Sequence, residues 1–256
     1  MLLAACNNNT QPAPANPVTD QPNEEKRLKD AISKYPDSLL LKQTLVQYYR
    51  DSGNYVAALK EVDDQLGKDS MNASLWHIKA VIHFEDGDTI AAIRSFKKEL
   101  LLFPNESAVV SLAMLYAQTK NPAAIEIADD LLKRDKINNQ KLADYIKGLY
   151  YSFRNEKIKA IGFFDKCLAL NYTFMDAYRE KAIALYDLEK YSEALAVLDK
   201  AITLQNNFDE GYYYSGRCLE KLNRIPEAIQ SYKNALVYDP EYMEAKEALT
   251  RLGVKN

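Results

Sequence analysis

Small and large apolar positions recur every 34 residues along this 256-residue chain. One column of the recurrence is alanine, and it holds Ala58, Ala92, Ala160, Ala194 and Ala228. A second column, four residues later, is large and apolar, and it holds Val62, Phe96, Phe164, Leu198 and Tyr232. A third, twelve residues before the alanines, is mostly small, and it holds Val46, Ala80, Met114, Gly148, Ala182 and Gly216. A fixed period of this length predicts a helix-turn-helix unit stacked on copies of itself.

The alternation of small and large columns also predicts how the two helices of each unit pack. Antiparallel helices approach closely only where one carries Gly or Ala, and a bulky side chain of the other then fills the adjacent space. We therefore expect the small column to face the large column within each unit. Prolines stand just past the expected second helices, where Pro ends a helix. They are Pro36, Pro104 and Pro240, and aromatic residues near the starts of first helices are Trp76, Tyr178 and Tyr212.

Over Trp76–Pro104 and Tyr212–Pro240 the chain resembles the tetratricopeptide repeat family, whose signature runs from an aromatic residue through Leu-Gly or Leu-Ala, Tyr, Ala and Phe to a closing Pro. The resemblance implies an all-α, right-handed α-solenoid of stacked helix-turn-helix repeats. We expect this solenoid over residues 23–256, with a half repeat at 23–38, six repeats at 39–242 and a capping helix at 243–253. The capping helix is expected to turn its polar side, with Glu244, Glu247 and Arg251, away from the core, which keeps a solenoid from recruiting another chain.

The third repeat departs from the pattern, because Glu126 and Asp130 stand where Ala and a large apolar residue belong. Ala124 and Ala128 come two residues early instead. We expect a shortened turn between the two helices of this repeat, a lengthened loop around residues 136–139 that restores the register, and a local kink. Two interpretations stay open: a hinge or specialised contact, or drift in a tolerant repeat.

Composition and charge exclude several classes of function. Lys and Arg number 33 against 36 Asp and Glu, and without a basic excess we expect no nucleic-acid binding. No stretch approaches the roughly 20 apolar residues of a membrane span. The two histidines, His77 and His83, fall on different sides of a helix, so we expect no shared metal site there. Gly67-Lys68-Asp69 lacks the rest of a phosphate loop, and no carboxylate pair stands out as acid and base, so we expect no cofactor and no enzymatic activity. Cys167 and Cys218 lie on core-facing columns and are expected to be buried free thiols.

The first residues of the chain suggest a membrane anchor. Leu3-Ala4-Ala5-Cys6 resembles the end of a bacterial lipoprotein signal, in which the cysteine is lipidated, so we expect residues 1–6 to be the remnant of a signal that starts upstream. Residues 7–22 are rich in Asn and Pro and cannot contribute to a core. They are expected to form a disordered tether, which at roughly 3 Å per residue spans up to about 50 Å.

The resemblance also implies where a partner binds, because first helices line the concave groove in this family. The residues that we expect to contact a protein or peptide partner are His77, Phe84, Tyr145, Arg179, Tyr186, Tyr213 and Arg217. For the apolar residues in the middle of the groove, contact with a partner and packing against neighbouring helices stay open; they are Val81, Leu115, Leu149 and Ile183. Chaperone-binding members carry Lys and Asn in the columns where this chain has Gln43, Gln47, His77 and Val81, so we expect no clamp for chaperone tails.

Together these features predict a non-catalytic scaffold for protein–protein interaction, held in the bacterial cell envelope by the lipid on Cys6 alone. The alternative is a cytosolic adaptor or regulatory module that binds a signalling or chaperone partner. A glycan-binding subunit that uses tyrosines as sugar platforms is a weaker third hypothesis, because grooves of this kind usually take polypeptide.

Overall fold

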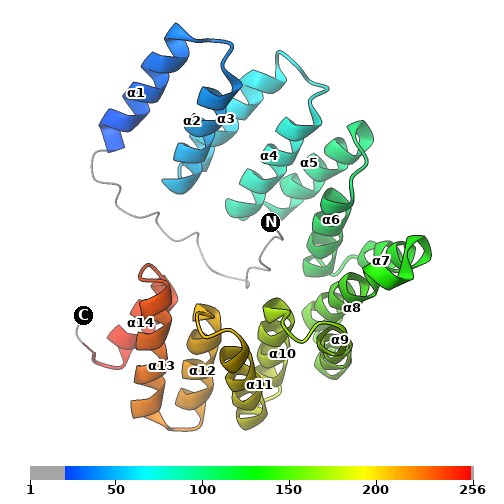
Figure 1. The fold of residues 1–256 in the computed structure, drawn as a ribbon, viewed down its shortest axis with the longest axis vertical. Helices are drawn as coiled ribbons and strands as arrows, with labels where there is room; N and C mark the ends of the chain where they lie inside the picture. The colour runs from blue at the N-terminus through cyan, green and yellow to red at the C-terminus, as the bar shows by residue number, and fades with distance from the viewer. Residues whose placement is uncertain (1–20, 255–256) are drawn as a thin grey trace. The chain divides into compact units, whose positions relative to one another are not determined.

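The computed structural model describes residues 21–254, which form fourteen α-helices and no strand (Figure 1). The helices are α1 (Gln21–Lys34), α2 (Leu39–Asp51), α3 (Tyr55–Leu66), α4 (Ala73–Glu85), α5 (Thr89–Leu102), α6 (Glu106–Gln118), α7 (Ala123–Arg134), α8 (Lys136–Phe153), α9 (Lys157–Leu170), α10 (Met175–Asp187), α11 (Tyr191–Leu204), α12 (Asp209–Lys221), α13 (Ile225–Tyr238) and α14 (Met243–Arg251). The predicted all-α solenoid is confirmed. The signal remnant, Cys6 and the tether up to residue 20 lie outside the described residues.

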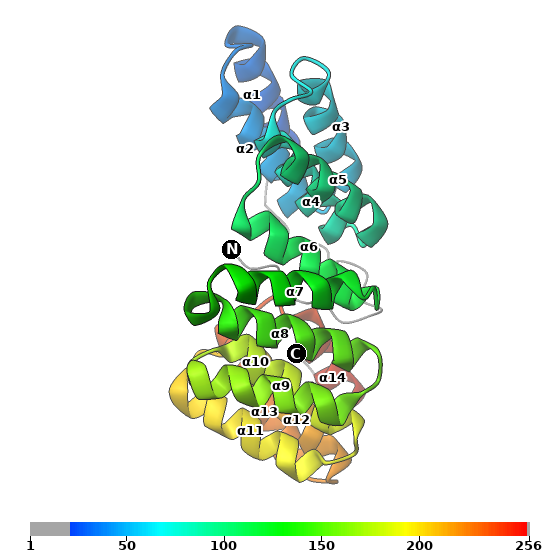
Figure 2. The same cartoon turned by 90° about the vertical axis from the view of Figure 1, so that its right-hand side faces the viewer.

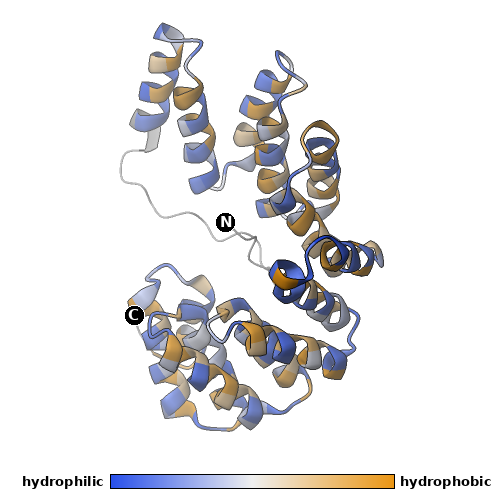
Figure 3. Cartoon of the chain, turned by 45° about the vertical axis from the view of Figure 1, so that its right-hand side comes forward, coloured by the Kyte–Doolittle hydropathy of each residue, from blue (hydrophilic) through white to orange (hydrophobic). Residues whose placement is uncertain are grey.

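The helices belong to two compact units, Met1–Leu112 and Ala113–Asn256, which we call unit 1 and unit 2. Within each unit a helix packs mainly against the helix before it and the helix after it in the chain. Figure 2 shows this stacking for α8 and α9 of unit 2, which lie side by side. Most helices carry both apolar and polar residues along their length (Figure 3), as expected when one side of a helix is buried and the other faces water.

The predicted contact between small and large columns is confirmed at its two glycines. A Cβ atom added to Gly148 would lie 2.5 Å from Cε1 of Phe164, and one added to Gly216 would lie 2.6 Å from Cε1 of Tyr232. Both rings are completely buried. Since real Cβ atoms do not approach a ring so closely, only glycine permits these helix crossings.

The turns between paired helices repeat with the same period and depend on one residue with a positive φ angle. These residues are Gly53, Gly87, Asn155, Glu189 and Asn223, each five positions before the buried alanine of its repeat. In the third repeat the residue is Lys120, which lies one position early, and Ala124 follows it after only four. The turn is therefore shortened, as the sequence predicts, and Ala124 and Ala128 are buried while Glu126 is exposed.

The prediction of a lengthened loop around residues 136–139 is wrong. These residues are the first turn of α8, which is 18 residues long and starts directly after Asp135. The Asp135 side chain caps the helix by accepting a hydrogen bond from the Asn138 backbone N at 3.1 Å. Asn139 then joins the two helices by donating from Nδ2 to the carbonyl oxygen of Leu131 at 3.0 Å. An added helical turn therefore restores the register where a loop was expected.

The ends of the described chain are packed onto their units. In unit 1, α1 begins at Gln21, inside the range predicted for the tether, and buries Leu28 against α2 and α3. The Tyr49 hydroxyl donates to Glu25 Oε1 at 2.8 Å and fixes α1 further. In unit 2, α14 buries Ala245, Ala248 and Leu249 in the core that it shares with α13.

The two cysteines of the described residues are free and buried, as predicted. Burial raises the pKa of both the Cys167 and the Cys218 thiol to about 12. They therefore act as apolar core residues at neutral pH.

Candidate functional site

A pocket of about 650 Å³ opens on unit 2 between α10, α12, α13 and α14. We call it the α12–α14 pocket. Its lining residues are Tyr186, Tyr213, Arg217, Glu220, Lys221, Tyr232, Glu244, Glu247, Ala248 and Arg251. It brings together three of the seven residues predicted to contact a partner, namely Tyr186, Tyr213 and Arg217.

Arg217 is the central side chain of one wall. Its guanidinium carbon lies 4.6 Å from the ring centroid of Tyr186, 5.5 Å from that of Tyr214 and 5.9 Å from that of Tyr213. Burial disfavours the charge of this partly buried group, but the tyrosines around it raise the pKa of Arg217. A cation so close to aromatic faces is held by attraction to the ring electrons, worth about 0.5–2 kcal/mol for each well-placed ring.

A second group of contacts in the pocket is centred on Glu220 of α12. Its carboxylate accepts two hydrogen bonds from Arg251, from Nη1 at 2.6 Å and from Nη2 at 2.9 Å, and a third from the Tyr232 hydroxyl. Burial works to raise the pKa of Glu220, but the bonds from Arg251 and Tyr232 outweigh it and hold the pKa below its ordinary value. This ion pair fixes the end of α14 against α12.

Tyr213 lines the pocket with a ring that packs against other aromatic rings. Its ring centroid lies 4.9 Å from that of Tyr242, at the start of α14, and 5.8 Å from that of Tyr232 on α13. Burial raises the pKa of Tyr213, which therefore stays neutral at physiological pH. The aromatic contacts hold the ring in place before any ligand arrives, which lowers the entropy lost on binding.

Two of the predicted contact residues are corrected by the structure, because Tyr145 and Arg179 are only 2% and 3% exposed. The Tyr145 ring lies 4.9 Å from the ring of Phe174, at the start of α10, which covers it. Arg179 forms ion pairs with three carboxylates, from Nη1 to Glu210 at 2.6 Å and to Asp176 at 3.2 Å, and from Nε to Glu180 at 3.3 Å. Both side chains stabilise the interior of unit 2 and are not accessible to a partner.

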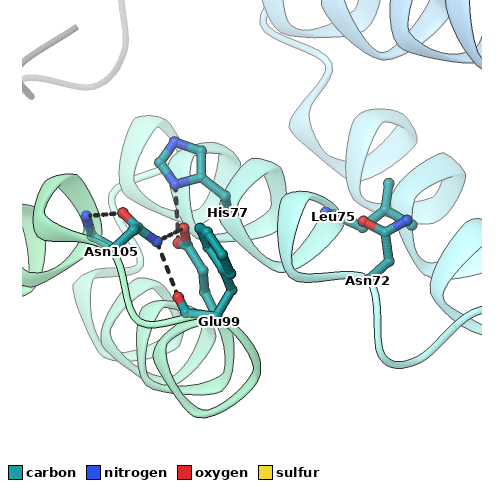
Figure 4. Close-up of polar contacts among 7 residues, drawn as sticks. Asn72, Leu75, His77, Glu99 and Asn105 are labelled. Atoms are coloured by element: carbon teal, nitrogen blue, oxygen red, sulfur yellow. Dashed lines mark hydrogen bonds and ion pairs between the residues drawn. The ribbon is translucent and has the colours of Figure 1, made fainter.

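His77 and Phe84 belong to unit 1 and are not among the residues that line the α12–α14 pocket. His77 Nδ1 lies 3.0 Å from Oε2 of the buried Glu99, whose Oε1 accepts from Asn105 Nδ2 at 2.8 Å (Figure 4). Asn105 also accepts from the Ala108 backbone N at the start of α6. His77 is thus engaged in a polar network that fixes the α5–α6 connection, and Phe84 is partly buried on α4.

Several pocket residues were missed as site residues from the sequence. Glu244, Glu247 and Arg251 were expected on an outward polar side of the capping helix, but they line the pocket. The signal for two of them is the 34-residue register itself, because it places Glu247 in the column of Tyr213 and Arg251 in the column of Arg217. Extending these columns into the capping helix would have found Glu247 and Arg251.

Other kinds of site find no support in the part of the chain that the structure describes. No group of three or more His, Cys, Asp or Glu side chains in residues 21–254 could hold a metal ion. Among the same residues, no helix combines the length and the apolar character needed to cross a bilayer.

Comparisons with known proteins agree with this architecture. Residues 179–242 match the family model described as Tetratricopeptide repeat. The crystal structure of a tetratricopeptide repeat protein from Parabacteroides merdae is similar with a TM-score of 0.72, covering 91% of this chain and 93% of that one at 20% identity, which supports the fold alone.

Two curated relatives are each 25% identical to this chain. A DnaJ homolog subfamily C member 7 homolog of Dictyostelium discoideum matches over 90% of this chain, and a TPR repeat-containing protein of Methanocaldococcus jannaschii matches over 77%. The aligned regions make up only 40% and 36% of the lengths of these relatives.

Proposed function

From the match of residues 179–242 to the tetratricopeptide repeat model, we propose that this chain is a scaffold that binds a peptide or a helix of a partner protein in the α12–α14 pocket. Proteins built from these repeats generally mediate protein–protein interaction, and their fold is generally a non-catalytic scaffold. The observation that carries the proposal is the convergence of Tyr186, Tyr213 and Arg217 in one open pocket.

The residue types of the pocket suit protein recognition. Tyrosine and arginine are enriched among the few residues that dominate the binding free energy of interfaces. Tyr213 offers apolar area on a ring that is already fixed, and Arg217 offers hydrogen-bond donors in addition to its charge. A pocket of about 650 Å³ is large enough for one or two side chains of a partner.

The test is the affinity of the purified protein for peptides selected against it from a random library, measured by calorimetry. Tyr213→Ala and Arg217→Ala are each expected to weaken binding by at least about tenfold. Tyr172→Ala is the matched control, since Tyr172 is an exposed tyrosine of unit 2 outside the pocket. Unchanged affinity in both pocket variants, with native thermal unfolding, would place the binding surface elsewhere on the molecule.

We further propose that this scaffold is anchored in the bacterial cell envelope by a lipid on Cys6. The support is the sequence Leu3-Ala4-Ala5-Cys6 followed by the Asn- and Pro-rich residues 7–22. Stable anchoring takes more than one acyl chain, which lipidation of the bacterial lipoprotein type supplies.

Intact mass and membrane fractionation of the protein expressed from its native locus test the anchor. An added acyl mass and a membrane location, both lost in Cys6→Ala, are the expected result. A soluble, unmodified product would overturn the envelope proposal and favour the cytosolic adaptor.

A further inference from the structure

The α12–α14 pocket contains charged side chains that lack partners of opposite sign. No carboxylate of the described residues lies within 4 Å of the Arg217 guanidinium, although the group is partly buried. On α14, Glu244 and Glu247 likewise form no ion pair with any residue in the range 21–254. A partly buried charge such as that of Arg217 usually has a partner of opposite sign, because the surrounding low dielectric makes an unpaired charge costly; Glu244 is also partly buried, whereas Glu247 is exposed.

The repeat itself shows that pairing is possible at these positions. Arg251, which occupies the same column as Arg217 one repeat later, binds Glu220 through two hydrogen bonds. Glu210, which occupies the same column as Glu244 one repeat earlier, binds Arg179 at 2.6 Å. The equivalent positions are therefore neutralised within the chain, whereas Arg217 and Glu244 are not.

The unpaired charges are sorted by sign onto two helices. Arg217 and Lys221 lie on α12, and Glu244 and Glu247 lie on α14. Of the two cations of α14, Arg251 is neutralised by Glu220 and Lys246 pairs with Glu241. The pocket therefore has a basic side and an acidic side, with the Tyr213 ring between them.

We propose that the partner segment bound in this pocket carries one acidic side chain that pairs with Arg217 and one basic side chain that pairs with Glu244 and Glu247. This inference rests on the proposed function and specifies the partner for the same site. Because the two charges of the pocket lie on different helices, the segment binds in one orientation only, with its acidic residue towards α12 and its basic residue towards α14. Charge complementarity of this kind fixes register and excludes wrong partners.

The experiment selects dodecapeptides, displayed on phage with their C-termini blocked by fusion, on the immobilised full chain. The enriched peptides are expected to share an acidic and a basic position at a constant spacing. An end-blocked synthetic copy of one such peptide should lose about tenfold in affinity when its acidic residue is replaced by the corresponding amide, and also when its basic residue is replaced by Gln. Both losses should shrink at high salt.

Variants of the protein show which side of the pocket selects the acidic residue of the peptide and which side selects the basic one. Arg217→Gln should remove the acidic preference and keep the basic one, whereas the double variant Glu244→Gln with Glu247→Gln should do the reverse. Arg217→Lys retains the charge and should retain the acidic preference, so a loss through misfolding in Arg217→Gln can be recognised. Lys233→Gln is the control, because Lys233 is an exposed cation of α13 outside the pocket.

The possible failures are distinguishable. If no peptide is enriched, or if enriched peptides bind Tyr213→Ala as well as the native protein, the proposed function itself is overturned. If binding depends on Tyr213 but the enriched peptides share no acidic and basic positions, or are the same on Arg217→Gln, only the inference about partner charge is overturned.

Discussion

At the scale of single residues, the fold depends on glycines that make room for one ring each. Gly148 and Gly216 occupy the small column of their repeats and contact Phe164 and Tyr232. The other glycine to compare is Gly162, in the interior of α9, where an added Cβ would meet nothing within 4 Å. The chain thus contains helical glycines that packing requires and a helical glycine that it does not require.

Substituting alanine at these two kinds of position should have opposite effects. Gly216→Ala is expected to destabilise the protein by about 1–3 kcal/mol, because the buried Tyr232 ring must shift to admit the methyl group. Gly162→Ala should stabilise it by about 0.5–1 kcal/mol through helix propensity alone. Urea unfolding measures both, and a loss of stability in Gly162→Ala, or none in Gly216→Ala, would contradict the packing account.

At the scale of helices, the junction of α7 and α8 shows how a repeat absorbs a shift in register. The turn before α7 is shortened, and an extra first turn of α8 compensates for it. Asp135 makes this possible, because it ends α7 and caps α8 at the same position. The departure from the repeat pattern therefore changes a helix boundary and leaves the stacking of α7 on α8 intact.

Removal of that cap should loosen the start of α8. Asp135→Ala is expected to lower the urea midpoint and to speed amide exchange at Asn138, while Asp135→Asn should retain most of the cap. Hydrogen bonds from the Asn138 backbone and side chain hold the pKa of Asp135 below its ordinary value. The contribution of the charged cap is therefore present above the unfolded-state pKa and is lost as the pH falls through the folded-state pKa. An Asp135→Ala variant with the same acid sensitivity as the native protein would contradict this role.

The sequence predicted the helices better than it predicted the site, for a physical reason. Periodicity reports which side of a helix is buried, so the small and large columns and the shortened turn could be identified from it. It does not report what covers a side chain from a neighbouring connection. Tyr145 was expected to be accessible but is covered by Phe174, and Arg179 is surrounded by carboxylates from two helices. The 34-residue columns were also not extended from the last repeat into α14, where Arg251 lies.

At the scale of the whole molecule, the final repeat and the capping helix of unit 2 form the α12–α14 pocket together. The Glu220–Arg251 ion pair links α14 to α12, and Glu244 and Glu247 of α14 line the same pocket as Arg217 of α12. A capping helix in this arrangement both covers the apolar end of the stack and supplies part of the surface that we propose binds the partner. Unit 1 carries a different set of first-helix residues, with His77 bound to Glu99.

Neutralising the link between α12 and α14 should therefore weaken binding without unfolding the unit. Glu220→Gln removes the charge that Arg251 pairs with but keeps an acceptor for the Tyr232 hydroxyl. We expect a lower affinity for selected peptides and faster amide exchange in α14, with a small change in the urea midpoint. Lys246→Gln, which removes only a pair with Glu241 in the turn before α14, is the matched control and should bind normally.

The central claim, that a partner segment occupies the α12–α14 pocket, is tested most directly by hydrogen exchange of the full chain with and without a saturating selected peptide. The account predicts slowed exchange in Asp209–Lys221 and Met243–Arg251, with little change in α9 or in unit 1. Protection confined to α9, to the inter-repeat loops or to unit 1 would contradict it.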